Sequence, residues 1–415
     1  MAPAADKDLF DHVETTFPSL PPFSKAVPTA PLLRISLQKL ANGDQSEEAR
    51  LWDTCRDVGF FYLDMRMGDS GPVDVDGVKE NEIDGNAILD EKDRLFELMK
   101  DMYALPAEEK VKYDRTAEGI YFGYKSFGRN ILDKKGTRDR NEYWNVSKND
   151  VLGDSEPQPN PDVIKEKRPL FASYVTHTHA ITTLIMRILN DKLGLQPGTF
   201  AEWHRLHGPS GDQVRLIHVP PQPPDDRTLS NGEHTDFGSV TVLFNKVGGL
   251  QIRLPPGMNP IPPSDVDDPS TIGKVKYSQD GSEMTAEEDS EWAYVVPIPG
   301  HAVINLGDAM TKFSAGVLRS NIHRVISPPG AQADCERYSL VYFTRPEYDV
   351  KLRHLGAESE IIMEHLKKTG RENEVEEVYT SREWVNKMSL GRRDMTTWSH
   401  SGGKKMDNLR QGVKT

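Results

Sequence analysis

The sequence predicts a mainly β protein with flanking helices, and three observations support this. From about residue 212 the chain carries short runs of branched and aromatic residues separated by Gly and Pro, which is typical of an antiparallel sandwich or barrel. Strand and helix patterns alternate before this region, and helical patterns return after residue 346. We therefore expect an α/β N-terminal region over 1–195, a β-rich domain over 196–350, and C-terminal helices with a tail over 351–415.

The N-terminal region combines strand and helix signals. In chain order, we expect a strand at 31–37, a helix at 47–58, a strand at 59–65, and helices at 91–105 and 169–195. In the second helix Leu95, Met99 and Met102 share one face, and Pro106 follows its end. The polar, Asp- and Gly-rich segment near 66–90 is predicted to be a surface insertion.

The β-rich domain contains six clear strand signals: DQVRLIHVPP, HTDFGSVTVLF, GGLQIRLP, WAYVVPIP, HAVINLG and RYSLVYFTRP. The segment 255–291 interrupts them. It is rich in Pro and then acidic, which favours an insertion on a loop.

Composition excludes several classes of protein. The net charge of −13 argues against binding to nucleic acid or an anionic membrane. The sequence has no long apolar run and no secretory signal pattern, and only two cysteines, Cys55 and Cys335. We therefore expect a cytoplasmic protein that acts on small molecules.

Two polar residues stand out in the run SNGEHTDFGSVTVLF at 230–244. If this run is a strand, His234 and Asp236 share a face. Two buried polar groups side by side are costly unless they bond to each other or bind a ligand such as a metal ion. His323, on a later β run, offers a second imidazole. Two histidines and one carboxylate on a β scaffold are the pattern of non-haem Fe(II) oxygenases, because three protein ligands leave adjacent coordination positions open.

A second polar pair lies in RYSLVYF. Arg337 and Ser339 are two apart and would share a face of their strand. A buried arginine requires an anion, and its planar fork suits a carboxylate. The alternative is an ordinary ion pair at a sheet edge, with Glu336 or Glu347 as partner.

Together these motifs resemble a known family. The string HTDF, GGLQI, PIPGHAVINLGDAM, SNIHRV and RYSLVYF resembles the isopenicillin-N-synthase-like branch of the Fe(II)/2-oxoglutarate-dependent dioxygenases. PLLRISL, DVGFFYLD, ALPAEEKVKY and GYKSF resemble the N-terminal domain of that family. The resemblance implies a double-stranded β-helix (jelly-roll) core, with His234, Asp236 and His323 as iron ligands. It implies that Arg337 and Ser339 bind the distal carboxylate of 2-oxoglutarate.

The resemblance also implies the reaction. An enzyme of this family consumes 2-oxoglutarate and O₂, releases succinate and CO₂, and oxidises an unactivated C–H bond by hydroxylation, desaturation or rearrangement. Ascorbate is a further candidate as reductant. We expect a small, hydrophobic specialised metabolite as substrate, because aromatic residues are dense in the region expected to face the iron. The candidate pocket residues are Tyr121, Phe122, Tyr124, Phe127, Arg215 and Leu243.

Two departures and several alternatives remain. Val219 stands where many relatives carry a tyrosine that contacts the co-substrate, and the insertion at 255–291 lengthens the separation between Asp236 and His323. The same iron triad serves isopenicillin-N-synthase-like and ascorbate-dependent oxidases that do not use 2-oxoglutarate. A non-catalytic jelly-roll binding module and a protein hydroxylase are further alternatives. The sequence does not predict the oligomeric state.

Overall fold

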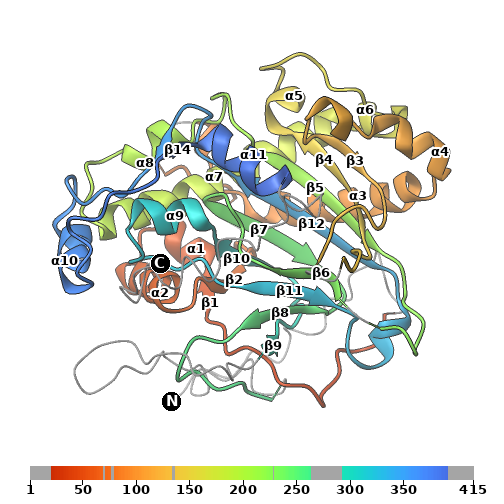
Figure 1. Cartoon of the computed structure of the whole chain (residues 1–415), viewed down its shortest axis with the longest axis horizontal. Coiled ribbons are helices and arrows are strands. Elements are labelled where there is room, and N and C mark those ends of the chain that lie inside the picture. The colour runs from red at the N-terminus through yellow and green to blue at the C-terminus, as the bar shows by residue number, and fades with distance from the viewer. Residues whose placement is uncertain are drawn as a thin grey trace.

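Two β-sheets form the centre of this computed structural model, which describes residues 20–68, 71–75, 79–132, 136–227, 229–262 and 292–390. The large sheet has the strand order β1-β2-β10-β7-β12-β5-β4-β3, and the small sheet has the order β6-β11-β8-β9. Figure 1 shows the strands of the small sheet lying together in the lower part of the view. Apart from the parallel pair β1 and β2, the pairings within both sheets of the described chain are antiparallel.

The strands of the large sheet are β1 (Arg34–Ser36), β2 (Phe60–Asp64), β3 (Gly123–Lys125), β4 (Glu142–Ser147), β5 (Gln213–Val219), β7 (Val240–Asn245), β10 (His301–Leu306) and β12 (Arg337–Thr344). Those of the small sheet are β6 (Leu229–His234), β8 (Leu250–Arg253), β9 (Trp292–Tyr294) and β11 (His323–Ile326). A separate pair is formed by β13 (Lys351–Leu352) and β14 (Tyr379–Thr380). Strands β5 to β12 thus form the two-layered core that the sequence predicted as a jelly-roll.

Strands from the N-terminal region continue the large sheet at both of its ends. β2 pairs with β10 on one side, and β4 pairs with β5 on the other. Strands from both sides of the predicted domain boundary at 195/196 therefore share one sheet. The boundary itself stays a prediction. β3 and β4 were not expected from the sequence, since both are short and lack a clear alternation of apolar residues.

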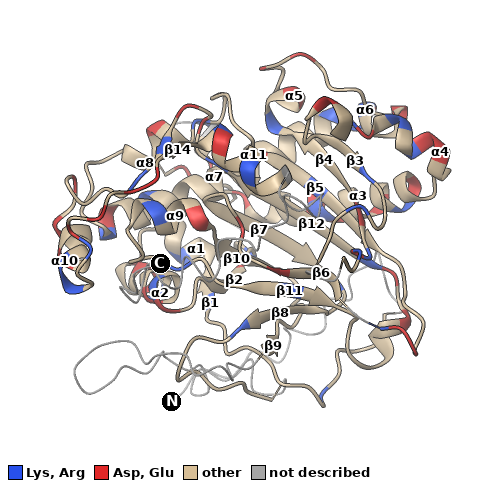
Figure 2. Cartoon of the chain, viewed as in Figure 1, with Lys and Arg blue, Asp and Glu red and all other residues tan. Residues whose placement is uncertain are grey.

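Helices flank the two sheets in the described part of the chain. They are α1 (Leu37–Ala41), α2 (Gln45–Asp57), α3 (Gly85–Tyr103), α4 (Ala107–Lys110), α5 (Lys148–Leu152), α6 (Asp162–Lys165), α7 (Arg168–Lys192), α8 (Thr199–Trp203), α9 (Asp308–Phe313), α10 (Glu360–Lys368) and α11 (Ser381–Leu390). Of these, α3 and α7 pack on β12 and on each other. Figure 2 shows that charged residues lie mainly on the outer helices and loops, whereas the strands have few of them.

The start of α3 differs from the sequence prediction. The helix begins at Gly85 rather than 91, because the Asp84 side chain caps it by accepting a hydrogen bond from the Ala87 amide at 2.9 Å. The predicted insertion near 66–90 is therefore partly helix. Val73 forms an isolated bridge with Ile83, so the described part of this segment is attached to the fold.

Strand β12 separates the core from the space between the two sheets. Its alternate residues Tyr338, Leu340 and Tyr342 belong to the apolar core under the helices. Arg337 and Phe343, on the opposite face, line a cavity between the sheets. Most of the predicted insertion at 255–291 lies outside the described residues, although Ile261 bridges to Thr29. No helix in the described chain is long and apolar enough to cross a membrane.

Candidate metal centre and co-substrate pocket

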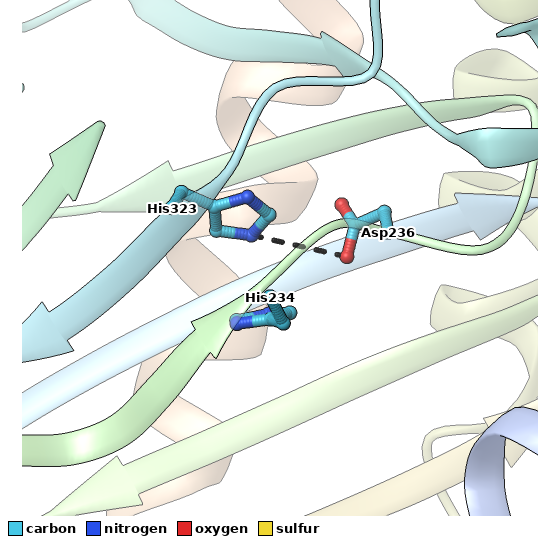
Figure 3. Close-up of side chains that lie close together, drawn as sticks. All are labelled: His234, Asp236 and His323. Carbon is cyan, nitrogen blue, oxygen red and sulfur yellow. Dashed lines mark ion pairs between the residues drawn. The ribbon is translucent and has the colours of Figure 1, made fainter. Parts of the chain in front are cut away.

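The structure brings His234, Asp236 and His323 together. His234 ends β6, His323 begins β11, and the two residues are paired across the small sheet. One ligand atom from each of the three side chains lies within 4.8 Å of the other two, and all three residues are buried. Figure 3 shows the imidazole of His323 directed at the carboxylate of Asp236, with a distance of 3.9 Å from Nε2 to Oδ1.

The two imidazoles are oriented by their own backbone. Nδ1 of His234 lies 2.8 Å from the carbonyl oxygen of Gly232, and Nδ1 of His323 lies 3.2 Å from that of Asn321. A carbonyl only accepts hydrogen bonds, so each Nδ1 carries the proton and donates it. Each Nε2 then carries a lone pair: that of His323 faces Asp236, and that of His234 accepts the Asn231 side-chain amide at 3.3 Å, a contact that a bound metal ion would replace. This arrangement, in which a hydrogen bond sets the tautomer of a ligand, is typical of metal-binding histidines.

The carboxylate of Asp236 is held in a similar way. Its Oδ2 accepts hydrogen bonds from the hydroxyl of Thr241 and the amide of Asn305, both at 2.7 Å. Oδ1 remains available toward His323. Burial acts to raise the pKa of Asp236, but the neighbouring imidazoles and these hydrogen bonds outweigh it and leave the pKa below its ordinary value.

The position of Asp236 corrects one expectation from the sequence. We expected the motif to lie within a strand, but β6 ends at His234 and Asp236 lies in the connection to β7. Contacts with distant segments determine this turn. The Asp308 amide donates to the Asp236 carbonyl at 2.7 Å, and a Cβ on Gly238 would lie 2.5 Å from the Thr344 carbonyl oxygen. The two ligands therefore converge through a turn rather than through strand alternation.

Two imidazole nitrogens and one carboxylate oxygen, at the wall of a cavity, are a donor set that suits Fe(II). The residues present therefore fit the metal that the sequence indicated.

Arg337 lies in the same cavity and is 3% exposed. Its Nε donates to the Gly248 carbonyl at 2.7 Å, and its Nη1 donates to the Ser339 hydroxyl at 2.6 Å. Burial lowers the pKa of Arg337 to about 10, so the group stays protonated at neutral pH.

The structure shows no ion pair between Arg337 and either Glu336 or Glu347. Glu336 accepts a hydrogen bond from the Tyr338 hydroxyl at 2.6 Å, and Glu347 pairs with Arg205 at 2.6 Å. No carboxylate among the described residues forms an ion pair with Arg337. A buried cation that has no carboxylate partner in the described part of the chain, beside a candidate iron site, is suited to an anionic ligand.

The glycines of GGLQI make room for Arg337. Gly249 has a φ of +104°, and a Cβ on it would lie 2.6 Å from the Ile326 carbonyl oxygen and 3.5 Å from Nε of Arg337. Gly248 supplies the carbonyl that Nε contacts. A side chain at 249 would therefore strain the backbone and crowd the guanidinium.

The cavity encloses about 1170 Å³, including its open mouth. Of the residues predicted to form a substrate pocket, Tyr121, Arg215 and Leu243 line it. The structure places the other three elsewhere. Tyr124 is buried against Trp144 with its hydroxyl on Glu142, Phe127 is 51% exposed, and Phe122 packs edge-on against Tyr121.

Several lining residues were missed from the sequence. They include Tyr143, Phe343, Arg345, Met388 and Ser389. Strand alternation after Arg337 and Ser339 could have identified Phe343 and Arg345. Nothing in the sequence indicated Met388 and Ser389, which α11 brings to the cavity from the far end of the chain.

Comparisons with known proteins identify the family of the chain. The family model described as non-haem dioxygenase in morphine synthesis, N-terminal, matches residues 31–166. The model of the 2OG-Fe(II) oxygenase superfamily matches residues 268–346, a range that contains His323, Arg337 and Ser339 but begins after Asp236.

Curated relatives carry the same description. The 2-oxoglutarate-dependent dioxygenase iboH of Amanita muscaria is 34% identical over 188 residues, covering 45% of this chain and 76% of that protein. A 2-oxoglutarate-dependent dioxygenase of Aspergillus fumigatus is 29% identical over 343 residues, covering 80% of each chain.

Among solved structures, a 2OG-Fe(II) oxygenase family protein from Caulobacter crescentus is similar in fold. The TM-score is 0.59 at 20% identity, covering 87% of this chain and 99% of that one. The dioxygenase for auxin oxidation of rice gives a TM-score of 0.55 at 19% identity, covering 88% and 97%. A full-length Neurospora crassa protein in complex with alpha-KG and thymine gives 0.59 at 18% identity, covering 86% and 96%. The predicted jelly-roll fold is thereby confirmed.

The chain belongs to the 2OG-Fe(II) oxygenase superfamily. It is an Fe(II)/2-oxoglutarate-dependent dioxygenase, a class that requires Fe(II) as cofactor and 2-oxoglutarate and O₂ as co-substrates. The alternative of a non-catalytic binding module is therefore set aside.

Proposed function

We propose that His234, Asp236 and His323 bind the iron and that Arg337 and Ser339 bind the distal carboxylate of 2-oxoglutarate. The observation that carries this proposal is the position of Arg337, a buried cation with no carboxylate partner among the described residues, in the same cavity as the triad. The substrate then occupies the rest of the cavity, and one of its C–H bonds is oxidised.

Each residue has a definite task in this proposal. The Nε2 atoms of the two histidines and Oδ1 of Asp236 would bind the metal. The carbonyls of Gly232 and Asn321 keep the histidine protons on Nδ1. Arg337 and the Ser339 hydroxyl orient the co-substrate through charge-assisted hydrogen bonds. Bound Fe(II) supplies the chemistry that couples decarboxylation of 2-oxoglutarate by O₂ to oxidation of the substrate.

The walls of the cavity favour a small substrate with an apolar part. Ile217, Leu243, Val341 and Phe343 line it, together with the rings of Tyr121 and Tyr143. These walls exclude water from the reacting centre, which limits side reactions. Hydroxylation is the default outcome, and desaturation or rearrangement would need a particular substrate. The fungal origin of the relatives supports a role in specialised metabolism.

Enzymes that use the same iron triad without 2-oxoglutarate are the second candidate. Arg337 and Ser339 favour 2-oxoglutarate but do not decide the question alone, because relatives that do not use 2-oxoglutarate can keep the same pair. The relatives described as 2-oxoglutarate-dependent support the same choice.

Anaerobic titration of the purified chain, first with Fe²⁺ and then with 2-oxoglutarate, tests the proposal. We expect a weak visible charge-transfer band in wild type that requires about tenfold to a hundredfold more 2-oxoglutarate in Arg337→Ala, which loses hydrogen bonds to a charged group. Arg371→Ala is the matched control, since Arg371 is also buried and donates to a backbone carbonyl, that of Ala315, outside the cavity.

Each result leads to a different conclusion. Iron binding without the band would favour an oxidase that does not use 2-oxoglutarate. Equal 2-oxoglutarate affinity in wild type and Arg337→Ala would remove Arg337 from the co-substrate site. Loss of iron binding in wild type would overturn the assignment of the triad.

A further inference from the structure

We propose that the substrate carries a carboxylate and that Arg345 and Arg215 bind it. This inference rests on the proposed function, because it treats the part of the cavity not used by iron and 2-oxoglutarate as the substrate site. It refines the expected small hydrophobic substrate to an organic acid with an apolar body.

The side chain of Arg345 packs against two glycines, Gly211 and Gly238. Arg345 follows the end of β12, is 2% exposed and lines the cavity. A Cβ on Gly211 would lie 3.3 Å from Cδ of Arg345, and a Cβ on Gly238 would lie 3.1 Å from its Cγ. Larger residues at these two positions would therefore displace the arginine stem.

No carboxylate among the described residues forms an ion pair with the guanidinium of Arg345. Its Nη1 donates to the carbonyl of Gly211, and its Nε is buried with no acceptor. Asp212 attracts the guanidinium electrostatically, but its carboxylate accepts from the backbone amide of Arg345 at 2.7 Å and forms no ion pair with the guanidinium. Burying an arginine in this way is costly unless an anion joins it.

A second guanidinium approaches the same place. Arg215, on β5, donates from Nε to Oδ1 of Asn145 at 2.8 Å and from Nη2 to the Tyr121 hydroxyl. The Cζ atoms of Arg215 and Arg345 lie 5.3 and 5.6 Å from the centre of the Tyr121 ring. They lie 5.0 and 5.5 Å from the centre of the Phe343 ring. Two like charges that share two rings repel each other, and an anion between them would offset this repulsion.

The charge of the whole cavity leads to the same conclusion. Arg215, Arg337 and Arg345 line it, whereas Asp236 is the single acidic side chain among the described residues that do so. Fe²⁺ and the two carboxylates of 2-oxoglutarate would cancel each other. The cavity would then keep an excess of positive charge, which a substrate carboxylate reduces.

The proposed acid site is close to the metal but distinct from the co-substrate site. The Cζ atom of Arg345 lies 5.3 Å from the ring centre of Phe237, the residue that follows Asp236. Arg337 begins β12 and Arg345 directly follows its end, so the two residues are about 26 Å apart along an extended chain. A carboxylate is favoured because the planar guanidinium fork binds it through two parallel hydrogen bonds.

Three aromatic acids and their uncharged amides provide the test: benzoate, cinnamate and 2-naphthoate against benzamide, cinnamamide and 2-naphthamide. Each is titrated calorimetrically, without O₂, into full-length protein loaded with Fe²⁺ and 2-oxoglutarate. The visible charge-transfer band is recorded before and after each titration. We expect at least one acid to bind about tenfold or more tightly than its amide. In Arg345→Met and in Arg215→Met this ratio should fall below about threefold.

Two further variants separate recognition from folding. Arg345→Lys keeps the charge but loses the planar fork, and we expect it to retain the preference for the acid in part. Arg371→Met removes a buried arginine outside the cavity and should leave the ratio unchanged. If Arg345→Met does not fold, the variant of the partly buried Arg215 and the lysine variant carry the test.

The outcomes distinguish the two proposals. Failure of the band to form before any acid is added would count against the proposed function. A normal band with no acid preferred over its amide would overturn the carboxylate site alone. An acid that binds but abolishes the band has displaced 2-oxoglutarate from Arg337, which would also overturn it. A preference that persists in both methionine variants would place the acid elsewhere.

Discussion

Val219 and Arg337 lie directly opposite each other where β5 pairs with β12. Both residues line the cavity, so a branched apolar side chain stands beside the guanidinium that we assign to 2-oxoglutarate. This is the place where the resemblance to relatives led us to expect a tyrosine. The phenolic hydrogen bond that a tyrosine would give the co-substrate is therefore absent at this position.

Introducing a tyrosine at position 219 should strengthen the binding of 2-oxoglutarate. We expect Val219→Tyr to lower the dissociation constant for 2-oxoglutarate by about threefold to tenfold, the effect of one added hydrogen bond. Val219→Phe, which adds the ring without the hydroxyl, should not do so. Anaerobic titration followed by visible absorption measures both variants. Equal affinity in the Tyr and Phe variants would show that the hydroxyl finds no partner there.

The hydroxyl of Thr241 should contribute to metal binding. It donates to Oδ2 of Asp236 and helps hold the carboxylate in position. We expect Thr241→Val, which is nearly isosteric, to weaken Fe²⁺ binding by about tenfold to a hundredfold. Thr178→Val removes a buried hydroxyl on α7, outside the cavity, and is the matched control. Competition with a calibrated Fe²⁺ chelator measures the affinities, and equal loss in both variants would contradict the assigned role.

The C-terminal helix α11 should affect substrate binding without affecting the co-substrate. Met388 is buried and lines the cavity, whereas Val385 is equally buried on the same helix but does not line it. We expect Met388→Ala to weaken binding of the preferred aromatic acid by about threefold to thirtyfold through lost apolar contact. Val385→Ala should not. Calorimetry on the loaded protein measures the effect, and a matching change in 2-oxoglutarate affinity would point instead to a general loosening of the site.

A buried polar cluster around Glu142 should make the unfolding free energy depend on pH. Glu142 on β4 contacts Lys110 and His218 at 2.9 Å and also accepts from the Tyr124 hydroxyl. Burial acts to raise the pKa of Glu142, but hydrogen bonds from these partners prevail and lower it to about 2. The carboxylate therefore stabilises the fold above its ordinary pKa of about 4.5, and this contribution is lost as the pH falls toward 2.

Glu142→Gln tests this cluster. We expect the variant to lose about 2–4 kcal/mol of unfolding free energy at pH 6, because the buried Lys110 loses its counter-ion. The difference from wild type should shrink between about pH 4.5 and pH 3. Urea unfolding at several pH values measures it. A difference that stays constant with pH would mean that the charge of Glu142 is not what stabilises the cluster.

The parts of the site that depend on local spacing could be predicted from the sequence. His234 and Asp236, and likewise Arg337 and Ser339, are two residues apart, and a pair at that spacing is visible in the sequence alone. The reasoning for the first pair was nevertheless wrong in detail, because Asp236 lies beyond the end of β6. Its place depends on Asp308 and Thr344, which are far away in the sequence, and local pattern carries no information about such contacts.

The substrate side of the cavity was less predictable for the same reason. Tyr124 and Phe127 lie in an aromatic run, but the pairing of β3 with β4 and the contact with Glu142 turn Tyr124 into the core. Met388 reaches the cavity only because α11 folds back over it. Arg345 could have been found, since it continues the alternation of β12 that begins at Arg337.

The alternation along β12 has a consequence for the selectivity of the reaction. If Arg337 binds 2-oxoglutarate and Arg345 binds the substrate carboxylate, the length of β12 fixes the separation of the two acids. The position of each acid relative to the iron ligands is then fixed as well. The number of bonds between the carboxylate of a substrate and the carbon that reacts would then be set by the strand rather than by the shape of the walls. Substitutions at Val341 or Phe343 would alter which apolar part of a substrate fits the cavity. The distance from the substrate carboxylate to the carbon that reacts would stay the same.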